Sequence, residues 1–281
     1  MDQGNTAFVL ISAALVLLMT PGLAFFYGGM VKAKSVVSMM MLSFGSLGLI
    51  AVLWVLYGYA ISFANEGTGN FYGIDGWFGI DLNSLGLNQQ VHDSLNVAEG
   101  VAYPSLAFVS FQATFAIITV ALISGAIADR AKFGAWMVFA GLWATIVYFP
   151  VANWVFNFTL EDGKVVDGGW IVYNLGVIDF AGGTAVHINA GAAGLALAII
   201  LGKRFGFSKG INQPHNVPLT LLGVALLWFG WFGFNAGSEV AADGIASLAF
   251  INTISAPAAA MLGWILIEKI KHGKATSIGA G

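Results

Sequence analysis

The chain has 281 residues, of which 58% are hydrophobic and only 9% are charged, and its mean hydropathy is +0.83. Soluble proteins carry about 25% charged residues, so this composition is typical of a protein whose solvent is mostly lipid. The absence of cysteine excludes disulfides, thiolate metal sites and cysteine nucleophiles.

Seven stretches are long enough to cross a bilayer, which requires about 20 mostly apolar residues. They predict an all-α fold, a polytopic membrane helix bundle. In chain order, the predicted spans are Asn5–Tyr27, Val36–Phe63, Val101–Ala126, Phe133–Phe156, Tyr173–Leu201, Val217–Ala236 and Ile245–Ile267. Pro21, Pro150 and Pro257 fall inside these spans, where neighbouring helices can satisfy the freed backbone groups.

The linkers between the predicted spans alternate sharply in charge. Ten of the eleven basic residues follow the first, third, fifth and seventh spans: Lys32, Lys34, Arg130, Lys132, Lys203, Arg204, Lys209, Lys269, Lys271 and Lys274. The other linkers carry acidic residues, namely Glu66, Asp75, Asp81, Asp93, Glu99, Glu161, Asp162, Asp167, Glu239 and Asp243, with Lys164 as their only cation. The positive-inside rule then predicts a multi-pass protein of the cell (inner or plasma) membrane with its N-terminus outside.

One ionisable residue stands out inside a predicted span. His187 lies in the middle of the fifth span, and an ionisable side chain at bilayer depth is a candidate functional residue. The alternative is a histidine that only packs against a neighbouring helix. Asp179, near the start of the same span, is expected to accept hydrogen bonds from the first free backbone N–H groups of the helix. The other three histidines, His92, His215 and His272, fall in linkers or the tail and are expected to be solvated.

Four segments together resemble the ammonium transporter family, which is related to the Rh proteins. Asp179–Asn189, followed by Gly202–Arg204, looks like the signature segment of the family. Pro21–Gly29, Phe111–Phe115 and Gly230–Ser238 are similar to segments of its first, third and sixth spans. The matches occur in order and cover nearly the whole chain.

This resemblance implies the ammonium transporter fold, with about eleven spans in two inverted halves and a homotrimer with one pore per subunit. By position, Phe115 and Phe234 correspond to the stacked outer gate, and His187 to the first of two paired pore histidines. An outer recruitment site would use Phe111, Phe156, Trp231 and Ser238. The family usually has tryptophan at the position of Phe156 and histidine at the position of Asn153, so this chain departs from the pattern at both.

The implied mechanism separates ammonium from potassium by proton chemistry. Ammonium is recruited by aromatic faces and a serine hydroxyl, loses a proton at the phenylalanine gate and passes the pore histidine as ammonia. Potassium cannot avoid the desolvation cost of an apolar passage. Asp179 would add a negative charge at the entrance, beside the proton relay at His187. An ammonium-sensing membrane receptor and a channel for another small neutral solute, such as water, are the alternatives.

The expected partners are ammonium or ammonia, membrane lipid and a PII-type cytosolic regulatory protein. We expect no nucleic-acid partner, no cofactor and no enzymatic activity, since no nucleophile–base pair or phosphate-binding glycine loop is evident. Residues 1–281 are expected to form a single transmembrane transporter domain that is incomplete at its C-terminus, with the first seven of about eleven spans present. Alone, they are not expected to form a working pore.

Overall fold

Long apolar helices form the body of the protein, here a computed structural model that describes residues 1–66, 70–96, 101–161, 164–204, 207 and 213–281. Within these residues, seven helical spans are long and apolar enough to cross a membrane, which confirms the predicted bundle. Glu99, Asp162 and Lys209, named above among the linker charges, lie outside the described residues.

Several spans consist of more than one helical segment. The first, α1, covers Gln3–Met30, and the second joins α2 (Val36–Leu53), a π-helical segment η2 (Trp54–Gly58) and α3 (Tyr59–Ser62). The third joins α5 (Ser105–Ile123) to the 3-10 turn η5 (Ser124–Ile127). The fourth joins α6 (Phe133–Trp143), the π-helical η6 (Ala144–Tyr148) and α7 (Phe149–Phe156).

The last three spans bring the candidate site residues together. The fifth begins with the π-helical η7 (Gly183–Ile188) and continues as α8 (Asn189–Leu201). The sixth is α9 (Val217–Asn235) with the 3-10 turn η9 (Ala236–Glu239), and the seventh is α10 (Gly244–His272), followed by the short α11 (Ser277–Ala280).

The predicted start of the fifth span at Tyr173 is wrong by ten residues, because the helix begins only at Gly183. Residues 173–182 are apolar but not helical, and Gly182 has a left-handed backbone with φ of +82°. Hydropathy alone could not separate this non-helical segment from the helix that follows it.

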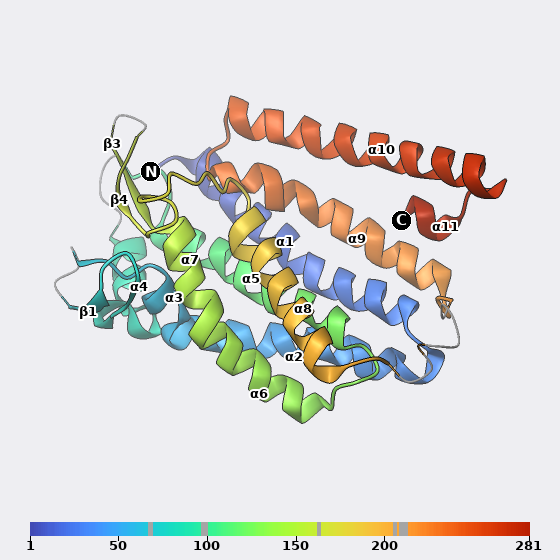
Figure 1. The fold of residues 1–281 in the computed structure, drawn as a ribbon. Helices are drawn as coiled ribbons and strands as arrows, with labels where there is room; N and C mark the ends of the chain where they lie inside the picture. Colours follow the sequence, from blue (N-terminus) through green and yellow to red (C-terminus); the bar gives the residue numbers. More distant parts are fainter. Residues whose placement is uncertain (67–69, 97–100, 162–163, 205–206, 208–212) are drawn as a thin grey trace.

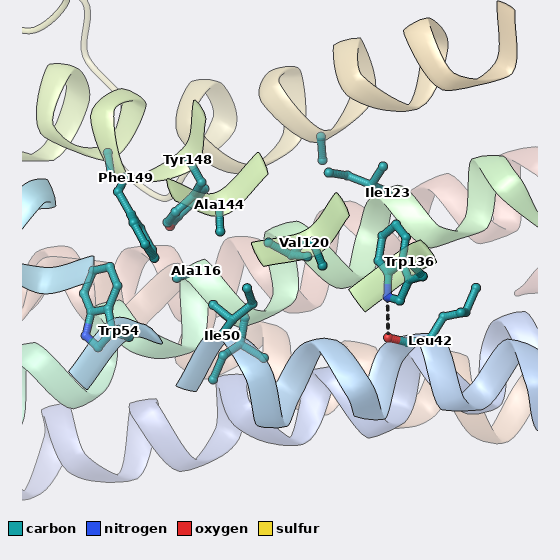
Figure 2. Packing of buried hydrophobic residues seen from close by; sticks show 14 of the residues in the cluster. Leu42, Ile50, Trp54, Ala116, Val120, Ile123, Trp136, Ala144, Tyr148 and Phe149 are labelled. Carbon is teal, nitrogen blue, oxygen red and sulfur yellow. Dashed lines mark hydrogen bonds between the residues drawn. The ribbon is translucent and has the colours of Figure 1, made fainter. Parts of the chain in front are cut away.

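Helix α5 is the central element of the bundle, and most of its residues are buried. One face joins a core with α2, α6 and α7, where the Trp136 indole donates to Leu42 O at 3.0 Å (Figure 2). The Trp54 indole donates to Val109 O of α5 at 3.1 Å. The opposite face joins a second core with α1, η7 and α9, which contains Phe111, Phe115 and Phe234. Because α5 serves both cores, its side chains are fixed from two sides.

Helices α1 and α9 pack closely along their length because glycines remove the side chains between them. A Cβ atom at Gly223 would lie 2.3 Å from Phe26 N, and one at Gly233 would lie 2.6 Å from Ser12 O. Small residues at such contacts let helix backbones approach in membrane bundles. The contact positions Phe234 and the rest of the C-terminal part of α9 against α5.

Two β-hairpins, which the all-α prediction did not include, lie at one end of the bundle (Figure 1). Strands β1 (Phe71–Ile74) and β2 (Phe78–Asp81) pair antiparallel, as do β3 (Phe158–Glu161) and β4 (Lys164–Gly168). We call this the hairpin end. The opposite end, where α1, η5, α8 and α10 finish and the described basic linkers lie, is the basic end.

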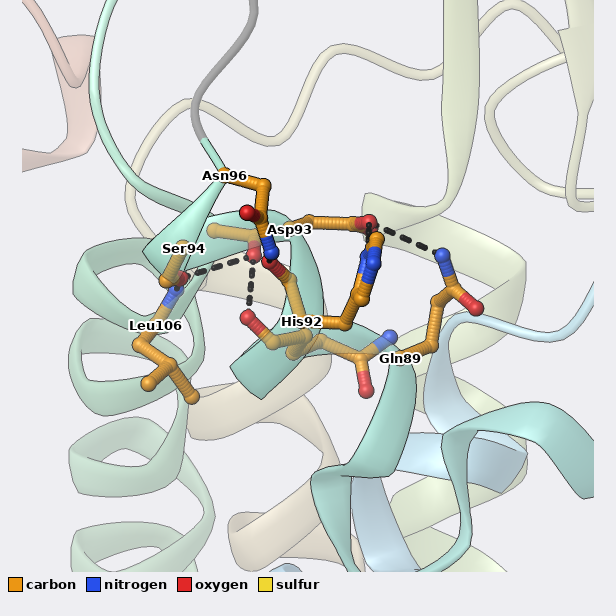
Figure 3. Close-up of polar contacts among 8 residues, drawn as sticks. Gln89, His92, Asp93, Ser94, Asn96 and Leu106 are labelled. Atoms are coloured by element: carbon orange, nitrogen blue, oxygen red, sulfur yellow. Dashed lines mark hydrogen bonds and ion pairs between the residues drawn. The ribbon is translucent and has the colours of Figure 1, made fainter.

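A short helix at the hairpin end fixes the start of α5. After the 3-10 turn η4 (Leu82–Leu87), α4 (Asn88–Leu95) brings Ser94 to the first turn of α5, where its hydroxyl oxygen accepts from Leu106 N at 2.9 Å (Figure 3). The Ser105 hydroxyl donates to Gln90 O at 2.9 Å. On the outer face of α4, Asp93 accepts from the Gln89 amide, and His92 is solvated as predicted.

Candidate functional site

Phe115 and Phe234, predicted from motif position to form a gate, are stacked face to face. Their ring centroids lie 4.3 Å apart with an interplanar angle of 25°. Both side chains are only 2% exposed. They come from α5 and α9, which run in opposite directions, and the tight α1–α9 packing sets the position of the second ring. The stacked pair presents only apolar surface, with no polar atom in either ring.

A second layer of rings lies one helical turn closer to the hairpin end. Phe111 packs at 4.8 Å from Phe115, and Phe156, at the end of α7, meets Phe115 edge to face at 6.3 Å. Ser238, in η9, donates its hydroxyl to Phe234 O at 2.7 Å. That bond uses the proton of the hydroxyl and leaves oxygen lone pairs to accept from a ligand. The neighbouring Gly237 fits against Phe111, since a Cβ there would lie 3.1 Å from the ring.

Asp179 caps the fifth span, as its position in the sequence predicts. One carboxylate oxygen accepts from Gly183 N at 2.8 Å, and the other accepts from Thr184 N at 2.8 Å and Ala185 N at 3.0 Å. Three of the free N–H groups at the helix start are thereby paired. The carboxylate also places a negative charge at the positive end of the helix. Its structural role is therefore explicit, and the proton-relay role stays a prediction.

His187 occupies a different environment from the one predicted. It is the fifth residue of the helical span rather than its midpoint, and its side chain is exposed rather than buried in the described chain. Both differences follow from the late start of the helix and from the uncovered face of α8. The ring orientation is still defined, because Nδ1 donates to Gly182 O at 3.2 Å. A carbonyl oxygen can only accept, so Nδ1 carries the proton in this bond.

Trp231 lies with His187 rather than with the outer rings. The indole stacks on the imidazole at 6.0 Å with an interplanar angle of 26°, and it contacts Phe234 at 5.7 Å. His187 in turn meets the edge of Phe234 at 5.7 Å. Among the predicted recruitment residues, Phe111 and Phe156 each contact the Phe115 ring on its hairpin side. Trp231 instead contacts Phe234 and His187 on the other side of the stacked pair.

A cavity of about 330 Å³ continues from His187 toward the basic end. Its lining comes from two helices: Leu122, Ile123 and Ala126 from α5 and η5, and His187, Ala190, Gly191 and Gly194 from η7 and α8. Apart from the imidazole, every lining side chain is apolar or absent. Among the described residues that line this cavity, His187 is the one polar side chain that a solute would meet.

Two site residues were not recognisable from sequence reasoning alone. Asn153 is 3% exposed and donates to Ala64 O at 3.0 Å, which ties the end of α7 to the end of the second span beside Phe156. Gly182 supplies the carbonyl that orients His187. The departure from histidine at position 153 was visible in the sequence, but its partner lies 89 residues away.

Comparison with known proteins gives a consistent result. The model of the Ammonium Transporter Family matches residues 7–280. An ammonium transporter of Mycobacterium tuberculosis is 56% identical over 99% of this chain and 59% of its own length. An ammonium transporter of Bacillus subtilis is 48% identical over 100% of this chain and 63% of its own length. The chain thus spans about three fifths of the length of these relatives.

Solved structures share the same fold. Saccharomyces cerevisiae Mep2 superposes with a TM-score of 0.84 at 33% identity, over 100% of this chain and 60% of Mep2. A structure described as a sensor Amt protein superposes with a TM-score of 0.83 at 27% identity, over 98% of this chain and 64% of its own.

Proposed function

The chain belongs to the ammonium transporter family and is a multi-pass membrane protein, and from this premise we propose that it carries the entry part of an ammonium pathway across a membrane. Ammonium is recruited at the hairpin end, gives up a proton at the Phe115–Phe234 gate and continues as ammonia past His187.

The observation that supports this proposal is the order of chemical groups along the bundle. From the hairpin end, a ligand meets Phe111, Phe156 and the Ser238 hydroxyl first, and then the stacked phenylalanines. Behind the gate come the imidazole of His187 and the apolar cavity. Along the path, a layer that attracts cations therefore comes first, an apolar barrier second and a proton acceptor third, which is the order that deprotonation of ammonium requires.

Recruitment rests on aromatic faces and one hydroxyl. An aromatic ring attracts a cation by about 0.5–2 kcal/mol, and the attraction is greatest for tryptophan. With Phe156 at the usual tryptophan position, we expect recruitment in this protein to be weaker than in family members that keep the indole. The free lone pairs of Ser238 Oγ accept one N–H of the ammonium ion.

The gate discriminates by desolvation. Two stacked rings, each 2% exposed, offer no polar atom that could replace the hydration shell of an ion. Potassium has no means of avoiding that cost, whereas ammonium loses its charge when it gives up a proton. Ammonia, the neutral product, then crosses the apolar segment.

His187 is suited to accept a proton on the far side of the gate. Its Nδ1–H is held by Gly182 O, so in the neutral ring Nε2 is the acceptor. The Trp231 indole stacks on the imidazole and holds the ring in place. We assign Trp231 to this proton-handling group and Asp179 to the support of the helix start.

The remaining parts of the proposal concern the assembly. The basic end faces the cytoplasm, which places the N-terminus outside the cell membrane. Three copies form a trimer with one path in each subunit, in contact with membrane lipid, and a PII-type regulatory protein docks at the basic end. Single cysteines at His92 and Lys203, both exposed in a chain without natural cysteine, test the orientation. Labelling of both from the same side of intact cells would contradict it.

The central test measures ammonium and potassium movement in liposomes that contain these residues together with the later spans of a full-length family member, because residues 1–281 alone are not expected to form a working pore. We expect ammonium to alter the internal pH or to drive a current at concentrations at which potassium does neither. Phe44→Ala, an exposed position on α2 distant from the gate motif, is the matched control for gate variants. Equal responses to the two ions, or a response no larger than that of protein-free liposomes, would refute the proposed function.

An ammonium-sensing role is the second candidate, favoured by the likeness to the sensor Amt protein. A receptor would bind ammonium without moving it. Binding measured by calorimetry together with zero flux in the liposome assay would favour sensing, and flux above the protein-free background would favour transport.

A further inference from the structure

Arg130 makes a contact at the basic end that the proposed function does not use. Its side chain donates to two backbone carbonyls, Ala126 O at the end of the third span and Gly202 O just after α8. Ala126 lies 4 residues from Arg130 in the chain and Gly202 lies 72 residues from it. The guanidinium therefore links two spans that no local interaction would hold together.

Both carbonyls belong to helix ends that need a partner. The last carbonyls of a helix have no intrahelical donor, and an arginine near a helix C-terminus satisfies them and complements the helix dipole. At the end of α8, Gly202 has a φ of +68° and no backbone capping bond is present among the described residues there. Arg130 supplies the missing donor.

The turn that carries Arg130 aims its side chain back at these ends. Arg130 N donates to Ile127 O at 2.9 Å, and Asp129 has a left-handed φ of +62°. The guanidinium is planar and presents its N–H groups as a rigid fork, so it can engage two carbonyls at once. The ammonium group of lysine is a single point and cannot span them in the same geometry.

The two spans that Arg130 joins are the walls of the cavity below His187. Leu122, Ile123 and Ala126 form one wall, and the α8 side, from His187 to Gly194, forms the other. The two walls come close near the basic end, where a Cβ added at Gly194 would lie 3.2 Å from Ala126 Cβ. Ala126 thus lines the cavity and also accepts from Arg130.

We propose that Arg130 is a positioning residue that sets the width of this cavity by tying the end of α8 to η5. The inference rests on the proposed function only in calling the cavity the exit of the ammonia path. Without the two guanidinium hydrogen bonds, the end of α8 separates from η5 and the cavity widens at the basic end. The pathway then discriminates less strongly against methylammonium, which is bulkier than ammonium.

The test reads the cavity directly with a cysteine at Ala190, a lining side chain that is buried, so that its reaction with a thiol reagent depends on opening of the cavity. The chain has no natural cysteine, so a neutral methanethiosulfonate reports on this position alone. Arg130→Met is expected to raise the modification rate by about tenfold, since loss of a charge-assisted hydrogen bond of about 1.5 kcal/mol shifts an opening equilibrium by that factor. Arg130→Lys should raise it nearly as much.

Lys132→Met is the matched control, because it removes one positive charge from the same linker at an exposed side chain without a capping bond. Equal rates in the Arg130 and Lys132 variants would overturn the proposal. If circular dichroism shows that Arg130→Met does not fold, the comparison is made with Arg130→Lys instead. A cysteine modification rate in Arg130→Lys equal to that in Lys132→Met overturns the proposal.

The ratio of methylammonium to ammonium flux is the second measurement, and it should rise in both Arg130 variants relative to Lys132→Met. The thiol reaction does not depend on transport. If the proposed function is wrong, flux is absent in every variant, but the cysteine modification rates can still be compared. If the role proposed for Arg130 is wrong, flux is present and the Arg130 variants have the same modification rates as Lys132→Met.

Discussion

The cap at Asp179 allows a prediction that separates a hydrogen-bonding role from a general charge effect. Its two carboxylate oxygens are both used, one by Gly183 N and the other by Thr184 N and Ala185 N. Asp179→Asn replaces one of these acceptors by an NH₂ group that faces a backbone N–H. The loss is one hydrogen bond to a charged group, about 1.5–3 kcal/mol.

Asp243 provides a matched control at the start of α10. A single oxygen of its carboxylate accepts from both Ile245 N at 2.9 Å and Ala246 N at 3.1 Å. The carbonyl oxygen of asparagine can accept both bonds, and Asn and Asp are about equal as N-caps. Asp243→Asn should therefore cost no more than the charge–dipole contribution, about 0.3–1 kcal/mol, because it also relieves the repulsion between Asp243 and the neighbouring Glu239.

The assay is thermal unfolding of both variants in the same detergent, followed by circular dichroism, together with ammonium flux in liposomes. We expect Asp179→Asn to lower the melting temperature clearly more than Asp243→Asn does and to reduce flux, because the capped segment carries His187. Equal melting temperatures for the two asparagine variants would refute the two-oxygen reasoning.

Three further outcomes follow from the site. Phe234→Ala should change ammonium flux or its selectivity far more than Phe44→Ala; similarly small effects would mean that the stacked pair is not the gate. His187→Ala should abolish proton-coupled ammonium movement or admit other cations, which is checked by potassium current; unchanged transport and selectivity would remove its proposed role. Asn153→Ala should destabilise the protein by about 0.5–1.5 kcal/mol, because Ala64 O loses one of its two amide donors and keeps the other, Asn157. Asn153→His should restore part of that loss in a melting experiment.

The membrane architecture could be predicted because hydropathy and charge are local properties of the sequence. The fourth span was predicted as Phe133–Phe156, and the structure has the same bounds. The cap at Asp179 was also predictable, since capping depends on residues four to six positions away. The stacking of Phe115 on Phe234 was expected from family resemblance, because nothing in the composition separates these two from the other phenylalanines.

The features that were missed depend on distant parts of the chain. The helix of the fifth span starts at Gly183 because the left-handed Gly182 and the capping carboxylate of Asp179 set its first turn there, whereas residues 173–182 are turns and irregular backbone. The hairpins depend on pairing between short strands in polar loops. The Arg130 bond to Gly202 O joins residues 72 positions apart, so in the sequence Arg130 is visible only as one charge of a basic linker.

The glycine-lined contact between α1 and α9 has a consequence for how the protein is made. The closest approaches join residues such as Gly22 and Gly223, about 200 positions apart in the chain. At about 5–20 residues per second, the ribosome needs roughly 10–40 s to synthesise the chain between them. Throughout that interval α1 is inserted without α9, its principal neighbour. The glycines of α1 that later contact α9 are then accessible to any other helix nearby. Correct assembly therefore depends on the intervening spans shielding α1 until α9 arrives, so variants that slow the insertion of α5 should reduce the yield of folded protein more than its stability once folded.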